Sequence, residues 1–383
     1  MNKKLLNVVY IGEPKFPSGG AMTKRWRYMV DYMNAHKIQS HILVCGHTIN
    51  NNNPQYGRYG IADFYDISHY IVSKHPIRYW AEGRRILKKW YNPSAKNILI
   101  FSTRLVPLQV PFFIFARKMG YITVFDQVET SILKSGKLGI KATINEWLGD
   151  TLSRYAVKKS HSFVISTALH KQNKEKFPDS KLCLLPNSTP IFQNEKKQSL
   201  HKPLRVLYSG TFAPKDGVSY LIDGAKKAFA EGCNLELTLL GKGLPWDMKV
   251  LEKIEGCSWV KYLGYVDDDE LMRQMLSADV LCMTRINSEF SNYGFPFKLS
   301  EYLATGNILL ASKVGDVCNY VEDRVNAVLV EPEDSDSIAE ALLWIAEHEQ
   351  ESLQVAHNSI NVVNKHFSIE VVGKIFIDFL KCL

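Results

Sequence analysis

The residues best suited to chemistry lie in the segment 295–311, FPFKLSEYLATGNILLA. Pro296 suits the first turn of a helix, because its missing N–H costs nothing there. The free N–H groups of such a helix start form an anion site, and Lys298 adds a positive charge beside them. Glu301 follows about one turn later, where a carboxylate accepts hydrogen bonds from sugar hydroxyls. These groups predict a site for a phosphate joined to a sugar. The alternative is an ordinary amphipathic helix with a solvated Lys and Glu.

Two earlier loops also place glycines before a helix start. The loop 12–21 contains Gly19 and Gly20, and the loop 208–218 contains Gly210, Thr211 and Lys215. Glycine lets the backbone approach a ligand closely, and a helix start favours phosphate. The first loop lacks the GK[ST] ending of a Walker loop and the GxGxxG pattern of a dinucleotide oxidoreductase. The alternative for the first loop is a plain strand-to-helix turn, and the alternative for Lys215 in the second is a surface lysine.

Further candidates stand at the ends of apolar runs. Gly241 and Tyr265 follow two such runs, and strand ends of an open parallel sheet are where ligands bind. Asp126 and Glu129 follow another run, 122–125. The GxSxG and HExxH patterns are absent, and the acidic run 267–269 reads as a helix cap rather than as the Asp-x-Asp motif of the metal-dependent transferases.

The elements that must position these residues alternate along almost the whole chain. Short apolar runs without strict alternation predict parallel strands covered on both faces; they are 7–11, 41–45, 97–101, 122–125, 162–165, 205–209, 236–240, 260–263, 280–283, 308–311 and 327–330. Helical periodicity fits 23–35, 107–118, 144–158, 218–230, 335–347 and 369–380, whereas the polar stretch 46–61 predicts a mobile loop. This alternation is typical of doubly wound α/β layers.

The chain length favours two domains, since 383 residues exceed one typical core. The proline-containing polar segment 187–203 is expected to link a first domain, 1–186, to a second, 204–365, and 366–383 to form a terminal helix that returns to the first domain. Seven scattered cysteines without a CxxC pair argue against a zinc site or disulfide framework and for a reducing, cytoplasmic compartment. The N-terminal apolar run is too short for a signal peptide, and no run reaches about 18 apolar residues.

The net charge of +8 suits a nucleic acid, an anionic membrane or a phosphorylated substrate. Nucleic acid is disfavoured because the interleaved aromatic and basic residues of an RNA-binding sheet are missing. The segment 74–91 instead combines six Lys and Arg residues with Trp and Tyr against a single acid, Glu82. It predicts a helix on the inner face of the cell membrane; the alternative is a solvated basic face on a core-packed helix.

The segments around Gly19, Gly210, Gly241, Tyr265 and Glu301 resemble, in this order, the donor site of retaining GT-B glycosyltransferases of the family 4 type. The resemblance covers nearly the whole chain, with a divergent first domain. It implies two Rossmann-like domains facing a central cleft, and it is closest to members that build surface polysaccharides. Two positions depart from the pattern: Tyr293 stands where the family has a first glutamate, and Thr211 stands where it has an arginine.

The resemblance implies a transferase that moves a sugar from a nucleotide diphosphate sugar to a glycan or lipid-linked acceptor, with retention, without a metal and without a cofactor. The resemblance also implies that the Glu301 carboxylate binds the ribose of the donor. Donor contacts are expected from Gly19, Gly20, Gly210, Thr211, Lys215, Gly241, Tyr265, Phe295, Pro296, Phe297, Lys298, Leu299 and Glu301.

In relatives the region of Asp126 and Glu129 lines the sugar and acceptor side, so these two acids are the candidates to position the acceptor hydroxyl; the alternative is a capping or buried structural acid. A nucleotide-sugar epimerase on the same fold, or a degenerate donor-binding subunit, remain open as functions. The sugar, base, acceptor and oligomeric state are not encoded in any pattern that the sequence displays.

Overall fold

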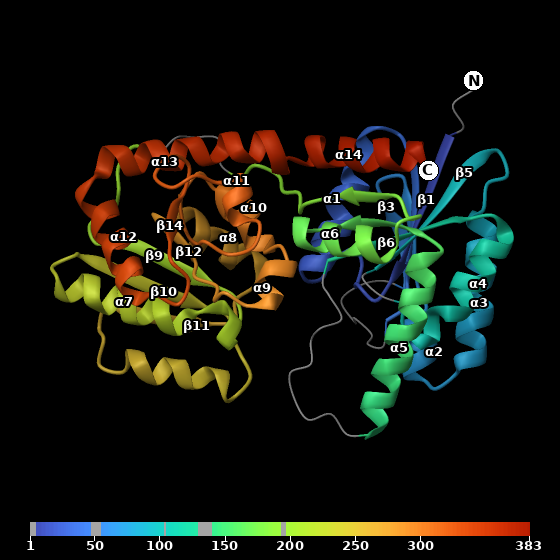
Figure 1. The fold of residues 1–383 in the computed structure, drawn as a ribbon, viewed down its shortest axis with the longest axis horizontal. Coiled ribbons are helices and arrows are strands. Elements are labelled where there is room, and N and C mark those ends of the chain that lie inside the picture. Colours follow the sequence, from blue (N-terminus) through green and yellow to red (C-terminus); the bar gives the residue numbers. More distant parts are fainter. Residues whose placement is uncertain (1–4, 47–54, 103–104, 129–139, 193–196) are drawn as a thin grey trace. The chain divides into compact units, whose positions relative to one another are not determined.

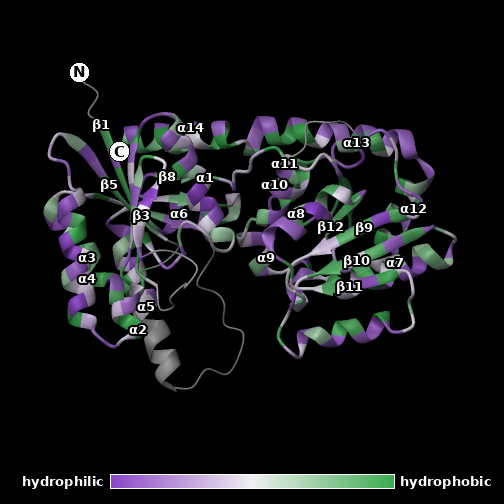
Figure 2. Cartoon of the chain, turned by 180° about the vertical axis from the view of Figure 1, so that it is seen from behind, coloured by the Kyte–Doolittle hydropathy of each residue, from purple (hydrophilic) through white to green (hydrophobic). Residues whose placement is uncertain are grey.

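The computed structural model describes residues 5–46, 55–102, 105–128, 140–192 and 197–383. It divides into two compact units: unit 1 comprises residues 1–188 and 369–383, and unit 2 comprises residues 189–368. Each unit consists of a largely parallel sheet with helices on both faces (Figure 1). In Figure 2 the strands of unit 2 are mostly hydrophobic, whereas its surface helices carry both hydrophobic and hydrophilic residues. This pattern is expected for strands covered on both faces.

The described residues of unit 1 form an eight-stranded sheet in the order β3-β4-β2-β1-β5-β6-β7-β8. Its strands are β1 (Leu5–Gly12), β2 (Gln39–Val44), β3 (Tyr56–Tyr59), β4 (Ala62–Asp66), β5 (Ala95–Ser102), β6 (Ile122–Gln127), β7 (His161–Val164) and β8 (Leu182–Leu184). Its helices are α1 (Ala21–Ala35), α2 (Ser68–Val72), α3 (Pro76–Trp90), α4 (Val110–Met119) after the 3₁₀ turn η1 (Pro107–Gln109), α5 (Ile140–Lys158), α6 (Thr167–Lys176) and α14 (Ile369–Cys382).

Unit 1 differs from expectation towards both edges of its sheet. The stretch 46–61 was predicted as a loop, but residues 56–59 form β3, which pairs antiparallel with β4; residues 47–54 lie outside the described part. Strands β3, β4 and β8 were not predicted, because each is short and its residues are mostly only partly buried or exposed. Such short, partly exposed strands lack the continuous apolar run that marks a central parallel strand.

Helix α14 packs against α1 (Figure 1). A Cβ atom at Gly373 would lie 2.2 Å from the Tyr32 ring, so the two helices touch where α14 has no side chain. Phe376 stacks on Phe163, with ring centroids 4.9 Å apart. The Lys96 ammonium group donates to a backbone carbonyl of the last turn of α14 over 2.7 Å, where a cation complements the helix dipole.

The described part of unit 2 forms a six-stranded parallel sheet in the order β11-β10-β9-β12-β13-β14. The strands are β9 (Leu204–Ser209), β10 (Leu235–Leu240), β11 (Val260–Gly264), β12 (Val280–Met283), β13 (Ile308–Ser312) and β14 (Val328–Val330). The helices are α7 (Val218–Ala230) after η2 (Pro214–Asp216), η3 (Asp247–Ile254), α8 (Asp268–Ser277), α9 (Glu289–Tyr293), α10 (Phe297–Leu303), α11 (Val317–Tyr320), α12 (Ser335–Glu347), α13 (Glu349–Val362) and the π-turn η4 (Val363–Phe367).

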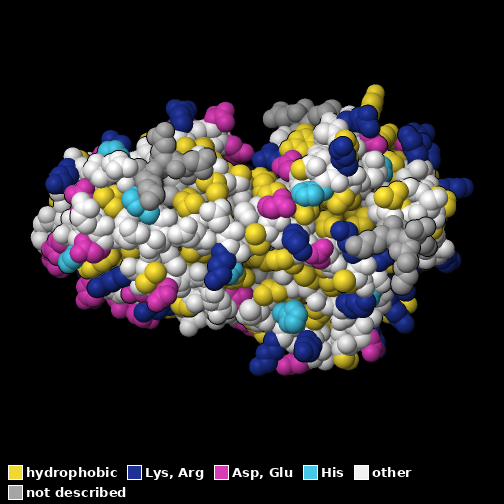
Figure 3. Space-filling model, turned by 90° about the horizontal axis from the view of Figure 1, so that it is seen from above, with side chains coloured by type: hydrophobic (Ala, Val, Ile, Leu, Met, Phe, Trp, Pro, Cys, Tyr) yellow, Lys and Arg dark blue, Asp and Glu magenta, His cyan; other side chains and the backbone are white. Residues whose placement is uncertain are grey.

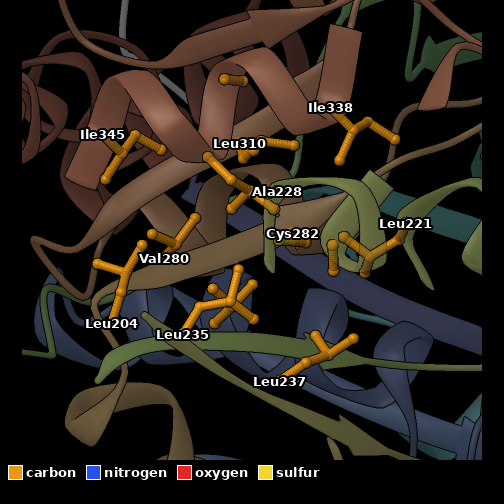
Figure 4. Packing of buried hydrophobic residues seen from close by; sticks show 14 of the residues in the cluster. Leu204, Leu221, Ala228, Leu235, Leu237, Val280, Cys282, Leu310, Ile338 and Ile345 are labelled. Carbon is orange, nitrogen blue, oxygen red and sulfur yellow. The ribbon is translucent and has the colours of Figure 1, made fainter. Parts of the chain in front are cut away.

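The core of unit 2 lies between the sheet and the packed pair α7 and α12. Figure 4 shows side chains from four strands meeting side chains of these helices, including Leu237, Val280, Leu221 and Ile338. All four are at most 2% exposed. Burying each such side chain contributes about 1.5–3 kcal/mol, so the sheet is a rigid base for the loops at its edges.

A buried acid ties the segment before β9 to the sheet of unit 2. Asp279 is fully buried and lies 2.9 Å from the Lys197 ammonium group. It also accepts hydrogen bonds from the backbone N–H groups of His201 and Arg205. Burial opposes its ionisation, but Lys197 and these hydrogen bonds outweigh it and lower the pKa of Asp279. The expected linker therefore includes residues that are bonded within unit 2.

Candidate functional site

Most of the predicted donor-binding residues lie in unit 2, on loops that follow strands of its sheet and in the segment 295–301 at helix α10. Gly210, Thr211 and Lys215 follow β9, and Gly241 follows β10. Strand β9 pairs in parallel with β10 on one side and with β12 on the other. Their carboxyl ends therefore share one edge of the sheet, which is the usual ligand-binding edge of this architecture.

These loops touch through their backbones. A Cβ atom at Gly241 would lie 1.9 Å from the carbonyl oxygen of Gly210, and one at Gly217 would lie 1.8 Å from that of Thr284. Both glycines have positive φ, +113° and +66°, which other residues rarely adopt. The Ile286 N–H also donates to the Lys215 carbonyl over 3.1 Å. The loops after β9, β10 and β12 thus form one packed surface.

Lys298 of α10 reaches into this surface. Its Nζ lies 4.4 Å from the centroid of the Tyr208 ring and 3.3 Å from the Tyr208 hydroxyl oxygen. A Cβ atom at Gly210 would lie 2.1 Å from the same Nζ, so the missing side chain makes room for the ammonium group. Burial lowers the pKa of Lys298 to about 8, and nearby cations add to this effect. A diphosphate would relieve this unfavourable placement of charge.

Lys215 adds a second cation, and its Nζ lies 4.1 Å from the centroid of the Phe290 ring. Asp216 next to it is only 7% exposed and accepts a hydrogen bond from the Thr211 hydroxyl group. Thr211 thus holds an acid in place, at the position where the family resemblance led us to look for an arginine. The negative charge of Asp216 attracts Lys298 and partly offsets the effect of burial on its pKa.

Helix α10 differs from expectation at its start. Pro296 is the N-cap residue with extended backbone, ψ 125°, rather than a residue of the first turn. The Leu299 N–H donates to the Pro296 carbonyl, so it is not open to an anion. The helix has only seven residues. The positive charge at this place therefore comes mainly from Lys298, and the helix start contributes less than the sequence suggested.

The remaining residues of the 295–301 segment divide into two groups. Phe295 and Leu299 are buried, and Phe295 packs against Tyr320 and Phe367. Any contact of these two with a ligand would have to come from their backbones. Phe297 and Glu301 are partly exposed, and the Glu301 carboxylate lies close enough to Lys298 to raise its pKa.

Tyr265 follows β11 and is 75% exposed. The Lys242 ammonium group lies 5.3 Å from the centroid of its ring. Tyr262 joins this strand to the Gly241 loop, because its hydroxyl group donates to the Gly241 carbonyl over 3.1 Å. An exposed aromatic ring beside a glycine loop has the properties of a stacking surface for a nucleotide base.

The two remaining glycines lie in unit 1. Gly20 is the N-cap of α1, and a Cβ atom there would meet open space. A Cβ atom at Gly19 would lie 2.4 Å from the Thr23 hydroxyl oxygen, and this hydroxyl group donates to the Lys15 carbonyl. The loop is therefore held by a hydrogen bond to its own backbone. It leaves the backbone of Gly19 and Gly20 uncovered by side chains of their own, just before a helix of 15 residues.

Asp126, the candidate for positioning an acceptor, is bound by a residue that sequence reasoning missed. Arg25 of α1 donates to both carboxylate oxygens of Asp126, over distances of 2.8–3.2 Å. It also donates to Asn187 and to the carbonyls of Leu185 and Pro186. Arg25 is 3% and Asp126 4% exposed. This geometry favours the alternative of a buried structural acid for Asp126.

Glu129, the second candidate, lies outside the described residues. The Asn187 side-chain oxygen accepts a hydrogen bond from Arg25. No signal in the sequence marks Arg25, because an arginine in an amphipathic helix normally faces solvent.

The 74–91 segment exposes its Lys and Arg side chains, whereas its Trp and Tyr residues are buried or only partly exposed. Tyr79 and Trp90 belong to the core of unit 1, and the Trp80 indole donates to the Leu108 carbonyl. Tyr79 and Trp90 thus complete the apolar face of the helix, and the membrane contact expected of this segment stays a prediction. The exposed residues of the segment include the cations Lys74, Arg78, Arg84, Arg85, Lys88 and Lys89 and the apolar Ile77, which is 78% exposed. Among the described residues, no helix is long and apolar enough to cross a membrane.

Elsewhere on the surface, Lys and Arg side chains are interspersed with uncharged ones, as on the face drawn in Figure 3. A cavity of about 290 Å³ lies at the edge of the unit 2 sheet where β9 and β10 begin, and its described lining includes Leu204, Cys233 and Glu347. It lies at the strand ends opposite to the loops described above. The predicted donor-binding residues do not line it.

Sequence comparison matches residues 203–348 to the family described as glycosyl transferases group 1. The amylovoran biosynthesis glycosyltransferase AmsK of Erwinia amylovora is 23% identical over 200 residues, which cover 50% of this chain and 48% of that protein. The phosphatidyl-myo-inositol mannosyltransferase of Mycolicibacterium smegmatis is 30% identical over 148 residues, which cover 38% of this chain and 36% of that protein. The chain thus matches less than half the length of these curated relatives.

Structure comparison covers almost the whole chain. Sucrose-phosphate synthase from Thermosynechococcus elongatus superimposes with a TM-score of 0.74 at 13% identity, covering 97% of this chain and 98% of that one. HepE of Anabaena, solved in complex with UDP-glucose, superimposes with a TM-score of 0.66 at 14% identity. The match covers 98% of this chain and 100% of HepE. Staphylococcus aureus TarM, in a complex that includes UDP, superimposes with a TM-score of 0.71 at 10% identity. The match covers 98% of this chain and 99% of TarM.

The fold is therefore the GT-B fold, with two Rossmann-like α/β domains, as the sequence predicted. The matched segment 203–348 includes all of the unit 2 loops described above. Fold and matched segment together support the class of GT-B glycosyltransferases.

Proposed function

We propose that the protein is a glycosyltransferase that moves a sugar from a nucleotide diphosphate sugar to a glycan or lipid-linked acceptor. One observation carries the proposal: Lys215, Lys298 and Glu301 stand on the packed loop surface at the carboxyl ends of β9, β10 and β12. This surface lies within the segment that matches glycosyl transferases group 1. Several fold neighbours were solved with UDP or UDP-glucose.

The chemistry follows from the leaving group. When the bond between the sugar and the diphosphate breaks, negative charge develops on the phosphate oxygens. Lys215 and Lys298 are already in place to stabilise this charge, in a loop framework that needs little rearrangement. The Glu301 carboxylate would accept hydrogen bonds from the ribose hydroxyl groups and orient the donor. Retention of configuration, with no metal and no cofactor, belongs to this proposal.

Unit 2 would hold the donor and unit 1 the acceptor. Within unit 1 the Gly19–Gly20 loop is the element proposed to approach the donor, because its backbone is accessible before α1. Tyr265 is proposed to stack on the base. The matches reported above give no support to the epimerase alternative.

Glu301→Gln tests the proposal, with Glu255→Gln as a matched control at an exposed position of the same unit. A thermal-shift screen of nucleotide sugars first identifies the donor, since a bound donor stabilises the protein by mass action. We expect Glu301→Gln to weaken donor binding about tenfold or more and the control to leave it unchanged. Slow release of free nucleoside diphosphate by the wild type is also expected. Unchanged donor affinity and turnover in Glu301→Gln would refute the ribose role, and donor binding without turnover, even with acceptor extract, would indicate a degenerate subunit.

We further propose that α3 contacts the inner face of the cell membrane, where a lipid-linked acceptor would be found. Support comes from its exposed cations and from Ile77 near its first turn, a combination that suits an anionic interface. Binding to vesicles of phosphatidylcholine with phosphatidylserine should exceed binding to phosphatidylcholine alone and should weaken with salt. Lys88→Glu with Lys89→Glu should abolish the difference, whereas the same change at Lys171 of α6 should not. Equal binding of both vesicle types would refute this contact.

A further inference from the structure

A third cation, Arg285, stands on the loop surface of unit 2 and was not among the predicted residues. It follows β12 after a single residue, Thr284. Its guanidinium carbon lies 5.7 Å from the centroid of the Phe290 ring, and the Lys215 Nζ lies 4.1 Å from the same centroid. Two positive charges from different loops are therefore gathered around one aromatic ring.

The backbone fixes the position of Arg285 relative to Lys215. The next residue, Ile286, donates its N–H to the Lys215 carbonyl over 3.1 Å. The preceding residue, Thr284, donates its hydroxyl group to the Gly217 carbonyl over 3.3 Å. The residues on both sides of Arg285 are thus bonded to the β9 loop, and Arg285 is held on the same surface.

Lys298 belongs to the same electrostatic cluster. Arg285 and Lys215 both act on its ammonium group and lower its pKa, in addition to the effect of burial. Three cations from three separate segments therefore repel one another in the unliganded protein. Asp216 offsets part of this repulsion, but its carboxylate is also engaged by Thr211. An anion with more than one charge would relieve the remaining repulsion.

We propose that Arg285 binds the diphosphate of the donor and supplies the positive charge that position 211 lacks. The inference rests on the proposed donor site. A guanidinium group can bind two phosphate oxygens at once through its planar fork, which a lysine cannot. The arginine thus comes from the loop after β12, while the β9 loop provides Lys215 and the backbone of Gly210.

Titration calorimetry of the full chain with UDP, GDP and the corresponding nucleosides tests this assignment. Arg285→Gln should weaken binding of the diphosphate about 10- to 100-fold and leave nucleoside binding within about twofold. Arg285→Lys keeps the charge but loses the fork, so a smaller loss is expected. Arg273→Gln removes a positive charge from an exposed side chain of α8 and should bind like the wild type. Thermal melting of each variant checks its folding.

The outcomes separate this inference from the proposed function. If the wild type binds a diphosphate and Arg285→Gln binds it equally well, Arg285 is not a ligand and the inference fails while the donor site stands. If Arg285→Gln weakens the binding of the nucleoside and of the diphosphate by the same factor, the residue acts on the fold of the site, and the inference fails too. If the wild type binds neither UDP nor GDP, both the proposed function and this inference are refuted.

Discussion

Replacing Asp126 with asparagine should destabilise unit 1 strongly. The change leaves the Arg25 guanidinium group buried without a counter-charge, in a site where both side chains are at most 5% exposed. Of the six hydrogen bonds that Arg25 donates, three go to the Asp126 carboxylate. Breaking a buried ion pair by removing one partner costs about 3–5 kcal/mol. The other three bonds hold the guanidinium group in place, so it cannot escape to water without disrupting the segment 185–187.

The assay should isolate unit 1, because a chain of two units need not unfold in one step. Urea unfolding monitored by hydrogen exchange in peptides from α1 and β6 reports on this unit directly. Asp179→Asn is the matched control, since Asp179 is an exposed acid of the same unit. It should change the free energy of unfolding by less than about 0.5 kcal/mol.

The same experiment decides between the two interpretations of Asp126. A structural acid predicts lost stability, and lost activity only in proportion to the unfolded fraction. A residue that positions the acceptor predicts lost turnover at unchanged stability. If the free energy of unfolding of Asp126→Asn lies within about 1 kcal/mol of the wild-type value, the reasoning from the buried ion pair is wrong.

Three further perturbations test other parts of unit 2. Gly217→Ala places a Cβ atom against the Thr284 carbonyl and should destabilise the unit more than Gly232→Ala. Gly232 also has positive φ, but a Cβ atom there would meet open space, so its replacement should cost about 1–2 kcal/mol. Urea unfolding of the two variants gives the comparison. Affinity for UDP should fall as pH rises through about 8, because Lys298 then loses its proton, and Lys298→Met should lack this dependence in calorimetry. Asp279→Asn should cost about 3–5 kcal/mol at pH 7. Because the pKa of Asp279 is lowered by folding, that difference should shrink as the pH falls below 3.8, the unfolded value.

The central strands and the long helices could be predicted because their signals are local. Strand β13, for example, is fully buried, and its apolar run is visible in the sequence. The edge strand β3 could not be predicted in this way, because its side chains alternate between exposed and partly buried positions. Its place in the sheet depends on pairing with β4, and no local pattern shows that pairing.

The candidate site was predictable where it rests on glycine loops and a helix, and not where distant charges meet. Lys298 and Lys215 stand in segments with a recognisable pattern. Arg285 stands in a loop without one, and hydrogen bonds between the β9 and β12 loops place it at the site. Arg25 and Asp126 are 101 positions apart, so their pairing depends on the packing of α1 against the sheet.

The division of unit 1 into two segments of the chain has a consequence for biosynthesis. A ribosome that has completed Ser188 must still translate all of unit 2 before it produces α14. At about 5–20 residues per second this takes roughly 10–40 s. During that interval the rings of Tyr10, Tyr32 and Phe163 lack the helix that covers them in the finished protein. The nascent chain would then be a client for chaperones, and premature termination before Ile369 should yield protein that aggregates.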